Sequence, residues 1–119
     1  MSYDVYLNDP VTKEHIILSE PHFMHGGTYQ LGGSTVLWLN ITYNYGKILR
    51  DVIDNEQGIR WLYGKGALET LPKLEEAILK LKAEVSADYW EPTEGNVKCA
   101  LLQLKTFARM RPDGIWDGD

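Results

Sequence analysis

The sequence has a single cysteine, Cys99, and no long hydrophobic run. One cysteine excludes an intramolecular disulfide, and 119 residues suffice to bury a core without one. No stretch approaches the roughly 18 apolar residues of a membrane span. Residues 1–20 also lack the basic and apolar segments of a secretory signal. We therefore expect a cytoplasmic protein that does not associate with membranes.

Positive charge is scarce as well. The chain has 12 Lys and Arg residues against 17 Asp and Glu residues, which gives a net charge of −5. Nucleic-acid binding through phosphate contacts needs a basic surface, so the composition argues against general nucleic-acid binding. An acidic surface also suits imitation of nucleic acid toward a basic partner, although mild acidity mainly keeps proteins soluble.

Motifs of the common catalytic classes are missing. The chain has no GxSxG, HExxH or P-loop pattern, and Gly64-Lys65-Gly66 falls far short of a phosphate-binding loop. A metal site would have to combine His22 and His25 with a distant ligand, such as an aspartate of the tail. We predict no catalytic residue, no metal and no cofactor, with a metal-assisted enzyme kept as an alternative.

What the chain does contain is typical of one globular domain over residues 1–119. Apolar residues make up 44% and charged residues 24%, with no repeat or linker. Tryptophan and tyrosine are abundant, at four and seven residues, whereas phenylalanine occurs twice. Both abundant types join a large apolar body to a polar group, so they suit cores, interfaces and pockets for flat ligands.

The first third of the sequence has the alternation of β-strands. Residues 3–7 predict one strand and residues 15–18 its hairpin partner. Strands are also predicted over residues 27–31 and 34–42, with Gly32-Gly33 as the tight turn between them. Because residues 34–42 carry apolar side chains on both faces, we expect this strand to be central in its sheet.

Helical periodicity follows. Apolar residues spaced three and four apart predict helices over residues 45–53, 71–85 and 94–110. Their expected N-caps are Asn44, Thr70 and Thr93. The order predicts an α+β fold, in which an antiparallel sheet of about four N-terminal strands is covered by three or four C-terminal helices. Trp116, near the chain end, is expected to dock on the domain.

The densest group of polar and aromatic residues lies where the last predicted strand meets the first helix. Trp38 and Asn40 share a strand face, and Tyr43, Asn44 and Tyr45 follow. Aromatic planes stack on bases, an amide can pair with an adenine edge, and a helix N-terminus favours an anion. This segment predicts a nucleotide-like pocket. The alternative is packing of the rings under the helices, with the two asparagines as backbone caps.

Two further segments complete the predicted ligand site. Backbone N–H groups around Gly26-Gly27 can approach an anion, although such a pair is also common in turns and bulges. Polar and basic side chains at the start and along one face of the last helix can meet the same anion. The predicted ligand-binding residues are His25, Gly26, Gly27, Trp38, Asn40, Tyr43, Asn44, Tyr45, Asn96, Lys98 and Arg109.

Five segments carry a resemblance to a known group of proteins. They are residues 3–7 (YDVYL), 26–29 (GGTY), 39–45 (LNITYNY), 89–96 (YWEPTEGN) and 111–118 (RPDGIWDG). They resemble small uncharacterised accessory proteins encoded by bacteriophages and prophages, over nearly the whole chain. The resemblance implies action in the cytoplasm of a bacterial host cell, and it assigns no activity or site residue. Accessory proteins of this kind include antagonists of host defence.

Three hypotheses of function result. The first is a non-enzymatic binding protein that sequesters a small nucleotide-like ligand and so antagonises host defence. The second is a protein–protein inhibitor of a host defence complex, such as a CRISPR effector, because Trp and Tyr are common interface anchors. The third is a metal-assisted enzyme built on His22, His25 and a tail aspartate. A homo-oligomer is compatible with each of them, since edge strands invite pairing.

Overall fold

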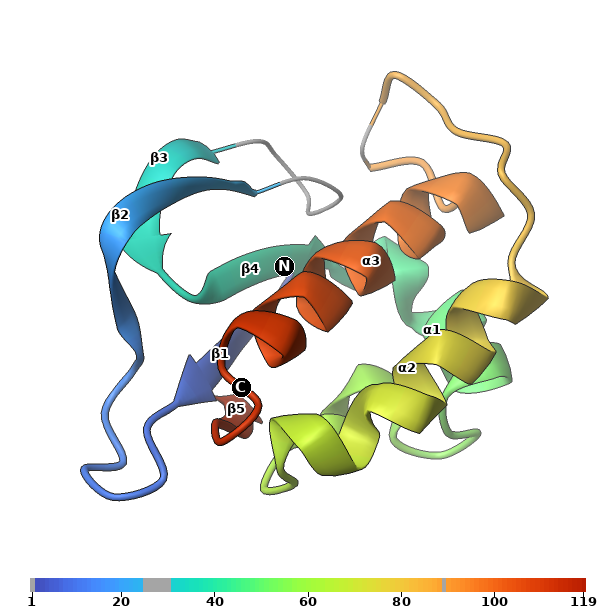
Figure 1. Cartoon of the computed structure of the whole chain (residues 1–119). Helices are drawn as coiled ribbons and strands as arrows, with labels where there is room; N and C mark the ends of the chain where they lie inside the picture. Colours follow the sequence, from blue (N-terminus) through green and yellow to red (C-terminus); the bar gives the residue numbers. More distant parts are fainter. Residues whose placement is uncertain (1, 25–30, 89) are drawn as a thin grey trace.

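A computed structural model describes residues 2–24, 31–88 and 90–119, and its strands and helices occupy separate layers (Figure 1). The fold is α+β, as predicted. The strands are β1 (Ser2–Asn8), β2 (Ile17–Met24), β3 (Leu31–Val36), β4 (Trp38–Thr42) and β5 (Ile115–Gly118). The helices are α1 (Gly46–Val52), α2 (Ala67–Lys80) and α3 (Glu94–Met110), with 3₁₀ helices η1 (Tyr43–Tyr45) and η2 (Gly58–Leu62).

The strands form two sheets. Strand β1 is central in the first sheet, with β4 and β5 antiparallel on either side, and β2 pairs with β3 in the second. The predictions that residues 34–42 are central and that Gly32-Gly33 is a turn are therefore wrong, because β4 is an edge strand and both glycines lie within β3. Of the predicted strand over residues 27–31, only Leu31 lies within the described residues.

The predicted hairpin between residues 3–7 and 15–18 is reduced to a short contact. It includes a bridge between Asn8 and His15 and hydrogen bonds from the Ile16 N–H to the Leu7 carbonyl oxygen and from the Asp9 N–H to the Glu14 carbonyl oxygen. Local alternation predicts that a segment is extended, but the choice of partner depends on which strands can bury their apolar faces together. Here β4 and β5 pair along the two edges of β1, whereas residues 15–18 contact only its end.

The tail forms strand β5, which was not predicted. Its pairing with β1 places Leu7 opposite Trp116 and Val5 opposite Gly118. Trp116 is fully buried, and its Nε1–H donates to Thr70 Oγ1 at 2.7 Å. The expectation that this tryptophan docks on the domain is confirmed. The strand escaped prediction because its Gly- and Asp-rich sequence has low β-propensity.

Helix α3 has the predicted bounds, and Thr93 Oγ1 accepts the Asn96 N–H at 3.1 Å, as expected of its cap. Helix α2 begins at Ala67, earlier than predicted, so Thr70 lies inside it and donates its hydroxyl to the Ala67 carbonyl oxygen. Thr42, not Asn44, caps the turn before α1. In the described part of the chain, no helix is long and apolar enough to cross a membrane.

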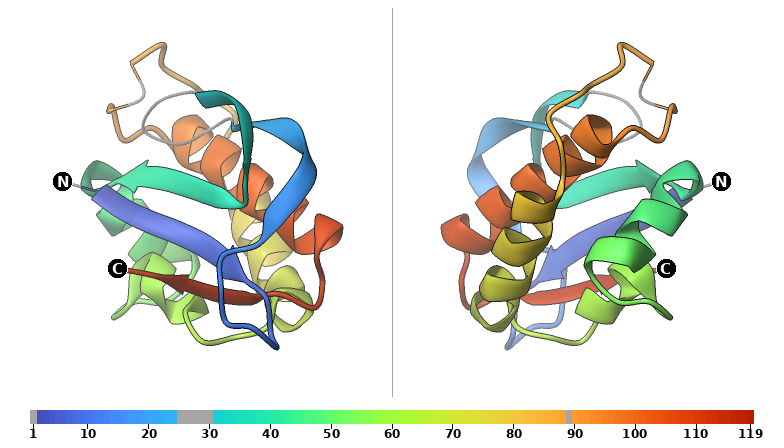
Figure 2. Two further views of the ribbon diagram at one scale, coloured as in Figure 1. Left: turned by 90° about the vertical axis from the view of Figure 1, so that its left-hand side faces the viewer. Right: turned by 90° about the vertical axis from the view of Figure 1, so that its right-hand side faces the viewer.

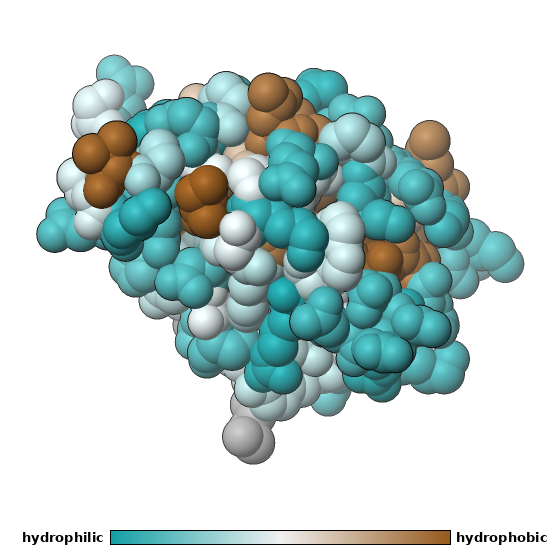
Figure 3. All heavy atoms as spheres, turned by 90° about the horizontal axis from the view of Figure 1, so that it is seen from below, coloured by the Kyte–Doolittle hydropathy of each residue, from teal (hydrophilic) through white to brown (hydrophobic). Residues whose placement is uncertain are grey.

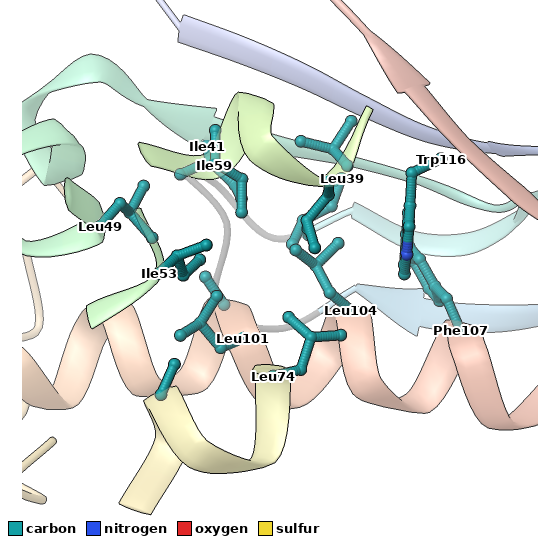
Figure 4. Close-up of a cluster of buried hydrophobic side chains, with 14 of the residues drawn as sticks. Leu39, Ile41, Leu49, Ile53, Ile59, Leu74, Leu101, Leu104, Phe107 and Trp116 are labelled. Atoms are coloured by element: carbon teal, nitrogen blue, oxygen red, sulfur yellow. The ribbon is translucent and has the colours of Figure 1, made fainter. Parts of the chain in front are cut away.

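The core lies between one face of the β4-β1-β5 sheet and the helices (Figure 4). The helices lie on that side of the sheet alone, as the two side views show (Figure 2). On the lower surface of the molecule, apolar side chains occur mostly singly among hydrophilic ones (Figure 3), which is ordinary for a protein surface. The labelled core residues are Leu39, Ile41, Leu49, Ile53, Ile59, Leu74, Leu101, Leu104, Phe107 and Trp116.

Candidate functional site

The candidate site is the outer face of the β4-β1-β5 sheet, the face turned away from the helices. Strand alternation sends every second side chain to this side, and the register sets Asp4 opposite Asn40 and Tyr6 between Trp38 and Asp117. In the left view of Figure 2 the three strands lie in front of the helices. The outer-face side chains are those of Ser2, Asp4, Tyr6, Asn8, Trp38, Asn40 and Asp117.

Three flat rings form a row along this face. The His15 ring stacks on the Tyr6 ring with centroids 3.8 Å apart and planes 7° from parallel. The Tyr6 and Trp38 rings follow, with centroids 6.4 Å apart and an angle of 22°. Cross-strand aromatic pairs of this kind order each other, so the row is a preformed surface for a flat ligand group.

Hydrogen bonds hold the His15 end of the row. His15 Nδ1 lies 2.6 Å from Asn8 Oδ1, and Asn8 Nδ2 donates to Asp117 Oδ2 at 3.2 Å. Because Asn8 Nδ2 donates to the Asp117 carboxylate, the amide atom that faces His15 is the oxygen, which can only accept. We therefore assign the proton of this hydrogen bond to His15 Nδ1. The orientation of the ring is therefore set by β1 and β5 together.

Asp4 organises the other end of the row. Its Oδ1 accepts the Trp38 Nε1–H at 3.0 Å and the Asn40 Nδ2–H at 2.8 Å. Asn40 Nδ2 also donates to Ser2 Oγ at 2.7 Å. Both side-chain donors reach one carboxylate oxygen, and no donor of the described residues reaches Oδ2, which can therefore accept from another group. Asp4 thus fixes the indole beside a carboxylate that retains capacity for a donor.

The outer face is acidic. Asp4 is half-buried, Asp117 is exposed, and the outer-face side chains of the described strands include no lysine or arginine. The exposed Asp119 follows β5 at the chain end, and its Oδ1 accepts the Asp4 N–H at 2.8 Å. Burial, together with the negative charges of Asp4 and Asp119, raises the pKa of Tyr6. The face therefore favours cations and disfavours anions.

Arg60 lies at one end of the sheet, where it contacts Tyr3, Tyr43 and Asp119. The Arg60 guanidinium lies over the Tyr3 ring, 4.9 Å from its centroid, and 5.8 Å from the centroid of Tyr43. Its Nε–H donates to the main-chain oxygen of Asp119 at 2.8 Å, and an NH2 proton goes to the Tyr43 hydroxyl at 3.3 Å. Tyr43, a predicted ligand residue, thus holds an internal cation.

The predicted segment from Trp38 to Tyr45 does not converge on one pocket. Trp38 and Asn40 share the outer face, as predicted, whereas the side chain of Tyr45 is fully buried in the core. Asn44 is exposed, and its Nδ2 donates to the Trp90 carbonyl oxygen at 2.8 Å. The change from strand to 3₁₀ helix after Thr42 turns successive side chains in different directions.

The predicted residues of α3 lie on the helical side of the sheet and are engaged within the chain. Asn96 is buried: its Nδ2 donates to the main-chain oxygens of residues 88 and 91, and its Oδ1 accepts the Ser86 N–H. Lys98 Nζ donates to the Leu81 carbonyl oxygen at 3.4 Å. Arg109 pairs with Glu75 at 3.6 Å. Asn96 therefore secures the loop before α3.

The remaining predicted residues, His25, Gly26 and Gly27, lie outside the described residues. Among the residues that the structure does describe, no group of three or more His, Cys, Asp or Glu side chains is placed to hold a metal ion. The histidine pair of the enzyme hypothesis, His22 and His25, is not covered by that statement, because neither side chain is among those described.

Sequence reasoning missed Asp4, Tyr6, His15 and Asp117. The alternation of residues 3–7 does separate Asp4 and Tyr6 from the apolar face, which is the one signal available. Their meeting with Trp38 depends on the pairing of β1 with β4, which no local pattern announces. Comparison of the chain with protein-family models, curated proteins and solved structures finds no match.

Proposed function

We propose that this protein is a non-enzymatic binding protein that engages a cationic segment of a partner protein through the outer face of its sheet. The observation that carries the proposal is that the carboxylates of Asp4 and Asp117 lie on that face together with the ring row of His15, Tyr6 and Trp38. Carboxylates attract lysine and arginine side chains, and aromatic faces attract the same cations. Charge complementarity therefore selects a basic partner.

The resemblance to phage accessory proteins supplies a context for this binding. A basic partner segment is what a nucleic-acid-binding surface of a host defence protein would present. An acidic, aromatic face seated on such a surface would compete with nucleic acid for it. The proposal is thus the protein–protein inhibitor of the second hypothesis, acting inside a bacterial cell.

The outer face supports a nucleotide-like ligand less well. The phosphates of a nucleotide would meet the negative charges of Asp4 and Asp117, and the Asn40 amide already donates to Asp4 and Ser2. The cations that were expected to meet an anion, Lys98 and Arg109, belong to α3 and contact Leu81 and Glu75. Helix α3 lies on the other side of the sheet (Figure 2). A nucleotide would have to bind elsewhere or displace these contacts.

Calorimetric titration of the full chain tests the proposal with defined probes. The probes are a short peptide rich in arginine and lysine, an acidic peptide of equal length, and a panel of nucleotides. We expect the basic peptide alone to bind, with an affinity that falls as salt is added, because salt screens exposed charges. Trp38→Leu and Asp4→Asn should weaken this binding.

The matched control is Asp51→Asn, which removes one negative charge from α1, where Asp51 pairs with Lys47 away from the outer face. It should leave binding of the basic peptide unchanged. If a nucleotide binds and the basic peptide does not, the first hypothesis is favoured. If Asp4→Asn and Asp51→Asn weaken peptide binding equally, binding depends on net charge and not on the outer face. Sedimentation of the same sample measures the predicted homo-oligomer.

A further inference from the structure

The corner of the outer face made by Asp4, Tyr6 and Trp38 has a more specific shape than an acidic surface requires. The indole is held against the carboxylate by the 3.0 Å hydrogen bond from Nε1 to Asp4 Oδ1. The Tyr6 ring stands 6.4 Å from it and nearly parallel, and His15 already stacks on Tyr6 at 3.8 Å. A flat cation on the indole would therefore find the carboxylate at its rim.

That arrangement suits a guanidinium better than an ammonium. A guanidinium is planar and weakly hydrated, so it stacks on a ring while its in-plane N–H groups reach a carboxylate. An ammonium is compact and strongly hydrated, and it gains less from a flat surface. Because Asp4 Oδ1 already accepts from Trp38 and Asn40, Oδ2 is the atom that would take the ligand N–H.

The same chain shows both kinds of cation on its own rings. Arg60 lies over two tyrosine rings and donates through Nε and NH2 to two oxygens. Lys65 lies 4.2 Å from the Trp61 ring centroid and donates to a single oxygen, the Trp61 carbonyl at 2.6 Å. The corner of Asp4, Tyr6 and Trp38 also combines two rings with acceptor oxygens, so it resembles the surroundings of Arg60 more than those of Lys65.

We infer that this corner is a guanidinium subsite, which makes arginine rather than lysine the residue that the partner must present. The inference rests on the proposed function, since it names the group recognised by the proposed binding face. It goes further in that net charge alone predicts no preference between the two cations.

Nuclear magnetic resonance of the full chain tests the subsite through the indole N–H signals of its tryptophans. The probes are the N-acetyl methylamides of arginine, lysine and citrulline, the last being flat like arginine but uncharged. The Trp38 signal is assigned by its loss in Trp38→Phe. We expect arginine to shift this signal with an affinity about fivefold above that of lysine, and citrulline to leave it unmoved.

Two variants separate the subsite from general charge. Asp4→Asn keeps an oxygen that accepts from Trp38 and Asn40, so the fold is retained, but it should abolish the preference for arginine over lysine. Asp117→Asn removes one charge from the same face beside Asn8. It should weaken both probes equally and leave their ratio unchanged.

Each result has a distinct meaning. Equal shifts of the Trp38 signal by arginine and lysine would overturn the subsite while the proposed function stands. A shift of another indole signal in place of Trp38 would also overturn it. If the basic peptide of the calorimetric experiment does not bind either, the proposed function itself fails.

Discussion

The two faces of the β4-β1-β5 sheet are built from alternate residues of the same strands, and they differ in almost every property. The inner face is apolar and sealed beneath the helices, with Val5, Leu7 and Leu39 essentially inaccessible. The outer face carries carboxylates, amides, the half-buried rings of Tyr6 and Trp38 and the exposed ring of His15. The difference shows that one short strand can supply the core with its odd-numbered positions and a polar outer surface with its even-numbered ones.

Two tryptophans make the contrast concrete. Each satisfies its indole N–H with a side-chain oxygen, Trp116 with Thr70 at 2.7 Å and Trp38 with Asp4 at 3.0 Å. Trp116 is fully buried among apolar neighbours, whereas Trp38 is half-buried on the outer face. Substitutions should therefore separate stability from binding according to the face on which they fall.

The largest effect is expected at Trp116. Replacing it by alanine removes the largest fully buried side chain of the described residues and leaves a cavity beneath the sheet, which should cost about 3–5 kcal/mol of unfolding free energy. Urea denaturation followed by circular dichroism measures the loss. A cost below that of Trp38→Leu would contradict the division between the two faces.

Gly118→Ala should have the next largest effect, through close approach rather than a cavity. An added Cβ would lie 2.5 Å from the Tyr63 hydroxyl oxygen and would also meet the Asp4 carbonyl oxygen. Because backbone borders the site, β5 would have to shift, at a cost of about 1–3 kcal/mol. The urea midpoint reports it, and an unchanged midpoint would show that β5 is less tightly held than its pairing with β1 implies.

Trp38→Leu sharpens the comparison from the outer side. It removes one cross-strand ring contact and one hydrogen bond, so the expected loss of stability is about 1 kcal/mol. Binding of the basic peptide should be weakened at the same time. Denaturation and calorimetry on one preparation measure the unfolding free energy and the peptide affinity. A stable variant that binds the peptide like the original would show that the outer face is not the binding surface.

Tyr63→Phe should have the smallest effect at neutral pH. The Tyr63 hydroxyl is the buried side-chain polar atom without a hydrogen-bond partner in the described part of the chain, so its removal should leave stability unchanged or slightly raised. Burial, followed by the charge of Asp119, raises the pKa of Tyr63 above its ordinary value of 10.0.

The sign of the pH dependence follows from that raised pKa. Below pH 10.0 the hydroxyl is protonated in both states, and above it the unfolded chain releases the proton while the folded chain retains it. Stability should therefore fall as the pH rises past this value, and less so in Tyr63→Phe. Urea midpoints at about pH 7 and about pH 11 give the comparison. An equal fall of the urea midpoint between the two pH values in both proteins would contradict the burial of the Tyr63 hydroxyl.

Much of the local structure was predictable because it depends on nearby residues. The bounds of α3 and its Thr93 cap follow from apolar spacing and a side-chain oxygen in the right place. The separation of Asp4 and Tyr6 from Val5 follows from alternation alone. The pairing of Glu76 with Lys80 at 3.0 Å likewise needs only the spacing of one helical turn.

The candidate site was only half predictable. Trp38 and Asn40 were identified as neighbours on one face, but the segment around them was expected to converge on a single pocket. Instead Tyr45 belongs to the core, Asn44 contacts the loop before α3, and Tyr43 holds Arg60. The residues that do join Trp38 come from β1 and β5, far from it in sequence.

By itself, the sequence determined the fold class, the α3 helix, the docking of Trp116 and the polar side of the first strand, because each depends on local spacing or on the burial of one large ring. Tertiary structure alone decided that β1 lies between β4 and β5, and with it which rings and carboxylates share the outer face. The reason is that strand pairing joins residues as distant as Tyr6 and Asp117. Such contacts are selected by the burial of the whole inner face rather than by any local pattern.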